Sequence, residues 1–270
     1  MSEVASVVFA AGRGSRMVGF EGNKTLLPLK PSLSSVYEGE APLLLEVLKN
    51  LPPGPRGIVV HHRAQDVRRA TDHLTGISYL FQPVTNGTGG ALLASRPFLQ
   101  ANPQERVIIT MGDVPLIRAA TYQQLVAMLH GHDLVLLAFT PRDRGQYGML
   151  EMGRGRLLRI VEWKYWKDWT PERQKRLQGC NAGVYAARRE TLLPYLDRMA
   201  ARPHRVQKER GGEWVTVEEY FLTDLVEWMS EDGLSIGVLH APEEEVMGVD
   251  SPEALRTAQK LHGARSGLEG

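Results

Sequence analysis

The chain has only one cysteine, Cys180, among its 270 residues. A single cysteine excludes a disulfide within the chain and a cysteine-rich zinc site. The sequence also has no apolar run that approaches the roughly 18 residues of a membrane-spanning helix. Its first residues lack a basic segment followed by a long apolar one, so we expect no signal peptide and a cytoplasmic protein.

Neither sign of charge is in excess. The chain carries 32 Lys and Arg residues against 31 Asp and Glu residues, a formal net charge of +1. Such a chain has no global field to attract nucleic acid or an anionic membrane, so we expect neither as a partner, and any anion site must be local. With 43% hydrophobic and 23% charged residues, the composition is that of an ordinary globular protein. The length suits one large α/β domain or two small ones.

What the chain does have is a glycine turn directly after an apolar run. Residues 4–9 predict a buried strand, which ends at the sequence Ala10-Ala11-Gly12-Arg13-Gly14-Ser15-Arg16-Met17. Gly12 and Gly14 have no side chain to block a close approach, and both can take positive φ. Backbone amides in such a turn form an anion site, and three cations lie near it in sequence: Arg13, Arg16 and Lys24. These features indicate a triphosphate ligand.

Two common phosphate-binding motifs are absent from this turn. A Walker A loop needs a spaced Gly-Lys-Ser/Thr, which is missing, and the dinucleotide fingerprint needs a third glycine, near whose place Met17 stands. From the glycines alone, an ordinary strand-to-helix turn with solvated arginines is the simpler interpretation. The rest of the chain has to decide between the two.

Strands and helices alternate through the first half of the chain. The pattern predicts strands over 57–61, 77–82, 107–111 and 134–140, and helices over 42–51, 64–74, 91–100 and 119–130. This rhythm indicates an α/β, Rossmann-like fold with a mostly parallel sheet and helices on both faces. Ligands of such sheets bind at the carboxyl ends of the strands. Gly12, Gln82 and Asp113 all fall at or just beyond a strand end, so one pocket could gather them.

The rhythm changes after residue 140. We expect a hairpin from 148–152 and 156–163, a strand over 180–187 and a helix over 189–199. The polar stretch 200–213 is expected to be mobile, and 215–229 to form an amphipathic helix. A strand over 234–239 precedes Ser251, which resembles an N-cap with Pro252 at the first helical position and a helix to about residue 261. We find no internal repeats.

Further short motifs follow the glycine turn and Lys24 in the chain. They are Gln82-Pro83-Val84-Thr85-Asn86-Gly87-Thr88-Gly89, Gly112-Asp113-Val114-Pro115-Leu116, Tyr147-Gly148, Ile160-Val161-Glu162-Trp163-Lys164, Asn181-Ala182-Gly183-Val184-Tyr185, Glu219-Tyr220-Phe221-Leu222-Thr223-Asp224 and Gly248-Val249-Asp250. Each is weak alone. In this order, over nearly the whole chain, they resemble the uridylyltransferase domain of N-acetylglucosamine-1-phosphate uridylyltransferases, in the sugar-nucleotidyltransferase superfamily.

The resemblance implies a GT-A-like nucleotidyltransferase fold with a small antiparallel region on the sugar side. It implies an enzyme that joins UTP and N-acetylglucosamine 1-phosphate, with Mg²⁺ as cofactor and release of pyrophosphate. We therefore expect one domain over 1–262, with a nucleotide-binding half (1–140), a sugar-binding half (141–262) and a frayed tail (263–270). The hexapeptide repeats of a left-handed β-helix are missing, so we expect no such domain and no acetyltransferase activity.

The resemblance also implies roles for residues on the nucleotide side. It assigns catalysis to Arg16, Lys24 and Asp113, and nucleotide binding to Ala10, Ala11, Gly12, Gly14, Gln82, Gly87 and Thr88. Asp113 and Asp250 would hold Mg²⁺, which prefers oxygen ligands. From residue types alone, Asp113 can also be a turn aspartate, Asp250 a capping residue beside Ser251, and Gln82 to Thr88 a plain glycine turn.

On the sugar side, the resemblance assigns Gly148, Glu162, Lys164, Asn181, Tyr220 and Thr223. Glycine leaves room for the ring, and a carboxylate and an amide can bind hydroxyl and N-acetyl groups. Glu162 can also be an ordinary strand residue, and an aromatic such as Tyr220 on an amphipathic helix is more often core.

Some positions depart from the family pattern. Met149 stands where the family tends to carry arginine, Asn23 where proline is usual, and the loop 32–41 is extra. Asp250 stands where asparagine is usual, which adds a charge. Two other functions stay open: cytidylyl or guanylyl transfer to a different phosphate acceptor, and a catalytically silent regulatory protein that binds a nucleotide sugar. A hydride-transfer dehydrogenase is remote, because the dinucleotide fingerprint is incomplete.

Overall fold

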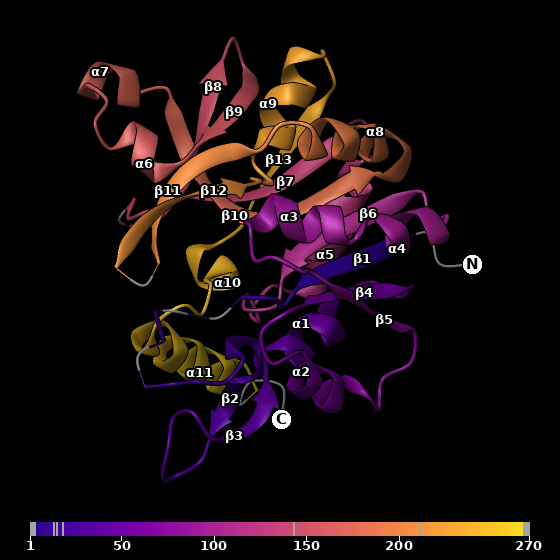
Figure 1. Ribbon diagram of the computed structural model, residues 1–270, viewed down its shortest axis with the longest axis vertical. Coiled ribbons are helices and arrows are strands. Elements are labelled where there is room, and N and C mark those ends of the chain that lie inside the picture. The colour runs from indigo at the N-terminus through magenta and orange to yellow at the C-terminus, as the bar shows by residue number, and fades with distance from the viewer. Residues whose placement is uncertain are drawn as a thin grey trace.

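The computed structural model describes residues 4–266, except residues 13, 15, 18, 143 and 211. Within these residues, nine strands form one central sheet (Figure 1). Seven of them lie side by side in the order β13 (Ile236–His240), β7 (Leu134–Phe139), β10 (Leu177–Arg188), β6 (Arg106–Met111), β1 (Val4–Phe9), β4 (Arg56–Val60) and β5 (Ile77–Phe81).

Six of these seven strands point the same way, and β10 runs against them. On β1, Val8 lies opposite Ile58 of β4 and Thr110 of β6. The prediction of a mostly parallel sheet is thus confirmed. Because the strands are parallel, the ends of β1, β5 and β6 open at one edge of the sheet, where ligands of such folds bind.

Helices cover both faces, as predicted. One face carries α1 (Leu43–Asn50), α2 (Ala64–Thr71) and α5 (Ala119–Met128), and the other carries α3 (Thr88–Ala94), α4 (Arg96–Ala101), α8 (Arg189–Ala200) and α9 (Asp224–Glu231). On α1, Leu44, Val47 and Leu48 are buried at the spacing of one helical face. In the described part of the chain, no helix is both long and apolar enough to cross a membrane.

The predicted helix over 91–100 is in fact two helices. α3 ends at Ala94 and α4 begins at Arg96. The buried Ser95 hydroxyl donates to the carbonyl of Leu92 at 2.6 Å, and Pro97 has no N–H to continue the helical ladder. A serine that bonds to a preceding carbonyl competes with helix continuation, which explains the break.

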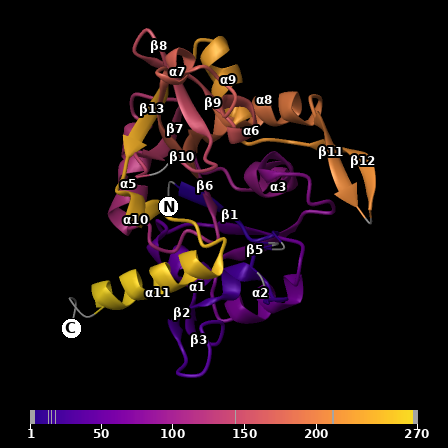
Figure 2. The same ribbon diagram turned by 90° about the vertical axis from the view of Figure 1, so that its left-hand side faces the viewer.

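The C-terminal segment packs back on the N-terminal half. α11 (Pro252–Ser266) lies against β2 (Pro28–Pro31), which pairs with β3 (Gly39–Pro42) and follows the 3-10 helix η1 (Lys24–Leu26). Figure 2 shows α11 running past α1 and β2. Ser251 caps α11, since its hydroxyl accepts from the Ala254 amide at 3.2 Å, as predicted. The helix continues to Ser266, so residues 263–266 of the predicted tail are helical and the remainder lies outside the described residues.

The predicted antiparallel region is present. β8 (Met149–Gly153) and β9 (Arg156–Val161) form the hairpin, and β8 also pairs with the start of β10. The short helices α6 (Trp163–Trp166) and α7 (Pro171–Gln174) lie between β9 and β10, and α10 (Glu243–Val246) follows β13.

The predicted helix over 215–229 is wrong in its first half. Two strands, β11 (His204–Arg210) and β12 (Glu213–Glu219), pair as a hairpin that projects from the body of the molecule (Figure 2). The stretch predicted to be mobile therefore contains a strand. Val206 pairs with Val217, and Val215 and Val217 are less exposed than Thr216 between them. That alternation has a period of two, the period of a strand.

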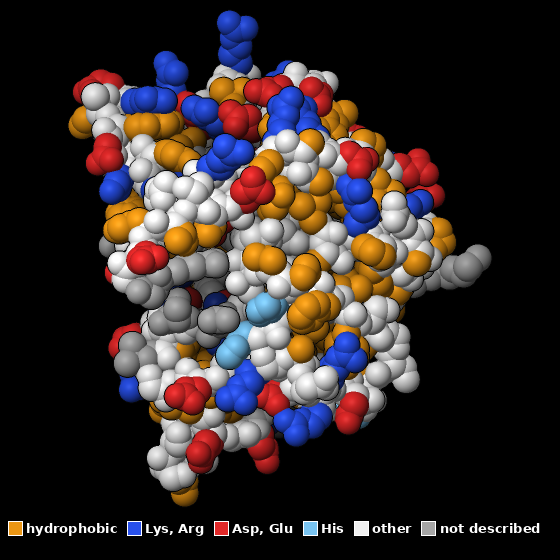
Figure 3. Space-filling view, in the orientation of Figure 1, with side chains coloured by type: hydrophobic (Ala, Val, Ile, Leu, Met, Phe, Trp, Pro, Cys, Tyr) orange, Lys and Arg blue, Asp and Glu red, His pale blue; other side chains and the backbone are white. Residues whose placement is uncertain are grey.

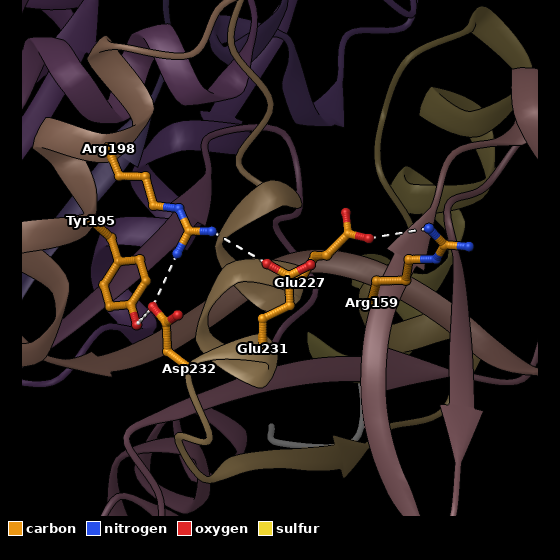
Figure 4. Close-up of polar contacts among 6 residues, drawn as sticks. All are labelled: Arg159, Tyr195, Arg198, Glu227, Glu231 and Asp232. Atoms are coloured by element: carbon orange, nitrogen blue, oxygen red, sulfur yellow. Dashed lines mark hydrogen bonds and ion pairs between the residues drawn. The ribbon is translucent and has the colours of Figure 1, made fainter.

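The second half of that prediction corresponds to α9, which is fixed by polar contacts on two sides. Arg198 of α8 pairs with Asp232 at 3.0 Å, and the Tyr195 hydroxyl donates to the same carboxylate at 2.7 Å. On the other side, Arg159 of β9 pairs with Glu227 at 3.1 Å (Figure 4). These contacts hold α9 between α8 and β9, and with it the turn 220–223 that precedes the helix.

Candidate active site at the carboxyl edge of the sheet

The glycine turn leaves β1 at the carboxyl edge. The Ala10 amide donates to the carbonyl of Val59 at 2.8 Å, and Ala10 and Ala11 are buried. Gly14 has a φ of +63°, and a Cβ there would lie 3.1 Å from Cβ of Lys24. Glycine therefore allows the turn to lie against Lys24. No described atom lies within 4 Å of a Cβ built at Gly12, so the turn is open on that side.

Arg13, predicted as a third phosphate cation, and Ser15 of the same motif lie outside the described residues.

Asn23, which the sequence reasoning noted only as a departure from proline, braces this turn. Its side chain is buried, and its Nδ2 donates to the carbonyls of Ala10 at 2.8 Å and His62 at 3.0 Å. Its Oδ1 accepts from the amide and the hydroxyl of Thr25 at 3.0 and 2.8 Å. All four contacts depend on a carboxamide, which proline lacks. Asn23 thereby fixes Lys24 beside the end of β1.

Four predicted residues come together as two ion pairs. Lys24 Nζ contacts Asp113 Oδ2, and both side chains are largely buried, at 18% and 15% exposure. Arg16 Nη1 lies 2.6 Å from Asp250 Oδ2, and this pair is more exposed. The Val249 amide donates to the carbonyl of Asp113 at 2.8 Å, so the segment that carries Asp250 lies against the end of β6. Figure 3 shows a hollow in the molecule with acidic and basic side chains inside it.

The two aspartates fit a magnesium ion. Mg²⁺ is commonly bound by one or two carboxylates together with substrate phosphates and water. Asp113 and Asp250 supply two carboxylates from adjoining segments. Among the described residues, no group of three or more His, Cys, Asp or Glu side chains could hold a metal by itself. The remaining ligands of a metal here would come from water and substrate oxygens.

Gln82 lies at the end of β5 and is buried. Its Nε2 donates to Asn86 Oδ1 at 3.2 Å and to the carbonyl of Gly87 at 3.3 Å. The backbone carbonyl of Gln82 contacts His61 Nδ1 at 2.8 Å. The predicted base-reading side chain therefore also shapes the loop 82–90.

That loop is bonded to the turn before α9, which no sequence pattern indicated. The Tyr220 amide donates to the carbonyl of Asn86 at 2.8 Å, and the Gly89 amide donates to the carbonyl of Tyr220 at 2.9 Å. The Leu222 amide donates to the Thr88 hydroxyl at 3.2 Å. A Cβ at Gly87, where φ is +95°, would lie 2.3 Å from the Tyr220 carbonyl oxygen. The glycine is therefore needed for this contact between the loop 82–90 and the turn before α9.

Glu162 and Thr223, both predicted to bind the sugar, contact each other. The Thr223 hydroxyl donates to Glu162 Oε1 at 3.0 Å. Burial raises the pKa of Glu162 and the nearby Asp224 adds to the rise, while the Thr223 hydrogen bond and the charge of Lys164 act in the opposite direction. Glu162 does not belong to β9, which ends at Val161, but stands at the N-terminus of α6.

Gly148 and Asn181 lie beside this pair. A Cβ at Gly148 would be 3.4 Å from Glu162 Oε2. The backbone N–H of Asn181 donates to the backbone carbonyl of Gly148 at 2.9 Å. Asn181 Oδ1 accepts from the Gly183 amide at 3.0 Å. Asn181 reaches the carboxyl edge because β10 runs antiparallel to its neighbours, so the first part of β10 lies beside the end of β7.

The structure places Tyr220 differently from the expectation and shows what surrounds Lys164. Tyr220 stands in a turn, not on a helix, and its backbone supports the loop 82–90. Lys164 Nζ lies 4.7 Å from the ring centroid of Phe221 and 4.9 Å from that of Tyr165. Its charge also acts on the carboxylates of Glu162 and Asp224. Its role towards a sugar phosphate stays a prediction.

A mostly parallel sheet with a glycine turn at its carboxyl edge is typical of nucleotide-binding proteins. Residues 6–209 match the family described as the MobA-like NTP transferase domain. The chain belongs to this family of nucleotidyltransferases, which confirms the predicted superfamily.

The chain is also similar to individual curated proteins. The chain is 30% identical over 269 residues to the bifunctional protein GlmU of Ruegeria sp., an alignment that covers 98% of this chain and 54% of that protein. It is 32% identical over 260 residues to the bifunctional protein GlmU of Cereibacter sphaeroides, covering 95% of this chain and 51% of that protein. The chain thus spans about half the length of the curated relatives it matches.

The fold is also similar to a solved enzyme. The uridine diphosphate N-acetylglucosamine pyrophosphorylase of Trypanosoma brucei superposes with a TM-score of 0.74 at 14% identity, over 95% of this chain and 65% of that one. At this identity the likeness concerns the fold alone.

Proposed function

We propose that this protein transfers a uridylyl group from UTP to N-acetylglucosamine 1-phosphate, forming a nucleotide sugar and pyrophosphate. The observation that carries the proposal is the pair of contacts Lys24–Asp113 and Arg16–Asp250 beside the glycine turn. Cations for phosphates and carboxylates for a metal are the two parts that phosphoryl chemistry of this kind needs. Both parts lie at the carboxyl edge of the sheet.

The reaction is a single in-line displacement. An oxygen of the sugar 1-phosphate forms a bond to the α-phosphorus, and the bond from that phosphorus to the bridging oxygen of the β-phosphate breaks. The electron pair leaves with pyrophosphate. The attacking phosphate is already ionised near neutral pH, so no protein base is required. Catalysis then consists mainly of positioning and of neutralising charge.

Each group on the nucleotide side has a task in this step. The open side of the turn at Gly12 offers backbone amides to the triphosphate, and Lys24 and Arg16 stabilise charge on the departing pyrophosphate. Asp113 and Asp250 would hold Mg²⁺, which when bound supplies positive charge to the phosphate oxygens. Substrate phosphates would then share Lys24 and Arg16 with the two carboxylates.

The base assignment rests on Gln82. Its Nε2 is used twice inside the loop 82–90, so the atom we assign to base recognition is the carboxamide oxygen. That oxygen accepts a hydrogen bond, which suits the N3–H donor of uracil and not the N3 acceptor of cytosine. The sugar assignment rests on Gly148, Glu162, Asn181 and Thr223, which can bind hydroxyl and N-acetyl groups.

In this proposal residues 1–140 bind the nucleotide, 141–262 bind the sugar, and the two halves form one domain. The protein acts in the cytoplasm, where nucleoside triphosphates are available.

The test is pyrophosphate release with Mg²⁺ across a grid of the four common nucleoside triphosphates and several sugar 1-phosphates. Release only with UTP and N-acetylglucosamine 1-phosphate is the expected result, and Asp113→Ala, which removes the oxygen ligand, is the inactive control. Another productive pair would overturn the substrate assignment but keep nucleotidyl transfer. No release, from protein that still binds nucleotide, would favour the silent regulatory protein instead.

A further inference from the structure

A cavity of about 530 Å³ lies where the C-terminal ends of α1 and α11 meet the segment that follows Asp113. Its polar lining comes from Glu46 and Lys49 of α1, Arg118 before α5, and His262 and Arg265 of α11. None of the candidate active-site residues is among its described lining residues. The cavity is therefore distinct from the glycine turn and the two aspartates.

Positive charge prevails on the wall of this cavity. Three described lining residues are cations, Lys49, Arg118 and Arg265, and Glu46 is the only carboxylate among them. Glu46 already pairs with Lys49 at 3.2 Å. The side chains of Lys49 and Arg118 are 71% and 64% exposed, so both can reach a ligand in the cavity.

Arg118 is positioned by a buried carboxylate behind it. Glu245 Oε1 accepts from the Arg118 amide at 3.1 Å, and Glu245 Oε2 lies 3.7 Å from Arg118 Nε. Glu245 also accepts from the Thr121 hydroxyl. Because these contacts engage the backbone and the base of the guanidinium, they fix Arg118 at the mouth of the cavity.

Arg265 lines the same cavity as Arg118. Its Nη1 donates to the carbonyl of Leu116 at 2.6 Å. Burial lowers the pKa of Arg265 and repulsion from Arg118 adds to the lowering, while Glu245 and Glu244 act in the opposite direction. Two arginines that line one cavity and repel each other would both gain from an anion bound there.

His262 adds no charge of its own. Burial lowers the pKa of its imidazole, and Lys30, Lys49 and Arg265 add to the lowering against the effect of Glu46. The ring is therefore neutral at pH 7 and is a polar wall of the cavity, not a fourth cation.

We propose that this cavity is a second anion site, which binds a phosphate group through Lys49, Arg118 and Arg265. Guanidinium groups present paired N–H donors that match phosphate oxygens, and lysine adds a compact charge. The volume falls within the range of small-molecule sites. It admits inorganic phosphate and also the phosphate of a small metabolite.

The proposed site adjoins the segment that carries Asp113. Arg265 is bonded to Leu116, three residues beyond Asp113, and Glu245 of α10 is bonded to Arg118. The segment after α10 is bonded back to Asp113 through the Val249 amide. A phosphate that holds Arg118 and Arg265 together thus stabilises both segments that carry the candidate metal ligands, so occupancy of the cavity is expected to influence Asp113 and Asp250.

The test is a titration with inorganic phosphate followed by backbone amide resonances. In the wild-type protein, resonances of Leu116, Ile117 and Ala119 should shift and saturate, separately from those of the glycine turn. In the double variant Lys49→Gln/Arg118→Gln, the dissociation constant read at these amides should rise by at least about tenfold, since charge-assisted hydrogen bonds are lost. The glycine-turn resonances should respond as in the wild type.

Arg205→Gln is the matched control, because Arg205 is a comparably exposed arginine on β11. Sodium chloride at equal ionic strength controls for screening. Shifts in the wild type that never saturate, or that persist unchanged in the double variant, would overturn the proposal. Parallel titrations with N-acetylglucosamine 1-phosphate and with a nucleoside monophosphate show whether free phosphate or a phosphorylated metabolite binds the cavity more tightly. These readouts are of binding, so they do not depend on the proposed transferase activity.

Discussion

The Thr223 hydroxyl donates a hydrogen bond to the Glu162 carboxylate at 3.0 Å, across 61 residues of sequence. This bond joins the end of the β8–β9 hairpin to the turn before α9. The same turn, through Tyr220 and Leu222, is bonded to the loop 82–90 that follows Gln82. One short turn therefore supports both the proposed base site and the proposed sugar site.

Thr223→Val should impair the enzyme most at acid pH. The Thr223 hydroxyl lowers the pKa of Glu162, so its loss raises that pKa and leaves a smaller ionised fraction. We expect the acid limb of the profile of kcat/KM against pH to move to higher pH. At neutral pH, kcat/KM should fall by about tenfold. Thr223→Ser keeps the hydroxyl and should restore the profile. If kcat/KM falls equally at every pH and the acid limb keeps its position, Thr223 does not act through Glu162.

Glu162→Gln should change the pH dependence of stability. Burial raises the pKa of Glu162 in the folded protein, so the folded state holds this proton more tightly than the unfolded chain. The stabilisation from this group is present at acid pH and is lost as pH rises through the folded pKa. The stability of the variant relative to wild type should therefore increase between about pH 4 and about pH 7. Urea unfolding across that range measures the difference, and a constant difference would contradict it.

Lys24→Met should abolish most activity and change the response to metal. Loss of one preorganised cation typically costs about 10²- to 10³-fold in kcat. It also leaves Asp113 largely buried without its partner, which lowers the melting temperature. Mg²⁺ should then raise the melting temperature of the variant more than that of wild type, because the ion replaces the missing charge. An equal response in both proteins would argue against Asp113 as a metal ligand.

Asp250→Asn tests the extra charge at the second candidate metal position. We expect the Mg²⁺ concentration for half-maximal activity to rise by about three- to tenfold, since one partly screened charge is lost. The maximal rate should be largely kept, because asparagine retains an oxygen ligand. Asp72→Asn, at an exposed position of the chain, is the control and should leave the metal dependence unchanged.

Gly87→Ala tests the contact between the loop 82–90 and Tyr220. The φ of +95° strains any side chain, and the new Cβ would also overlap the Tyr220 carbonyl oxygen. Gly76→Ala is the control, since Gly76 has a φ of +72° but no described atom within 4 Å of its Cβ position. The control should cost about 1 kcal/mol of unfolding free energy, and Gly87→Ala on the order of 3 kcal/mol. Urea denaturation measures the unfolding free energy of both variants. Equal losses would mean that the loop 82–90 moves away from Tyr220 to accommodate the new Cβ.

Much of the structure of residues 1–140 follows from the sequence. Runs such as 107–111, each ended by a polar or glycine signal, define parallel strands, and parallel strands bring Gly12, Gln82 and Asp113 to one edge. The structure of residues 141–262 is less evident from the sequence. Its hairpin β11–β12 has few apolar residues, and the alternation of Val215 and Val217 is too short to prevail over the helical pattern that follows.

The hydrogen bonds by which Asn23 supports the glycine turn could also not be predicted from the sequence. It depends on the carbonyls of Ala10 and His62, which only the fold brings together. A single buried polar residue outside a helix or strand leaves no hydrophobic periodicity in the sequence by which its burial could be predicted. The direction of β10, which delivers Asn181 to the edge, is likewise a property of the assembled sheet.

The course of β10 affects how the protein can be divided. β10 lies between β6 and β7, and it is the strand that joins β7 and β13 to the rest of the sheet. A fragment that ends at residue 140 would expose the edge of β6 and leave β7 without a neighbour in the sheet. Such an edge invites pairing with other chains. The first half, although it carries the glycine turn and Asp113, would therefore aggregate when made alone.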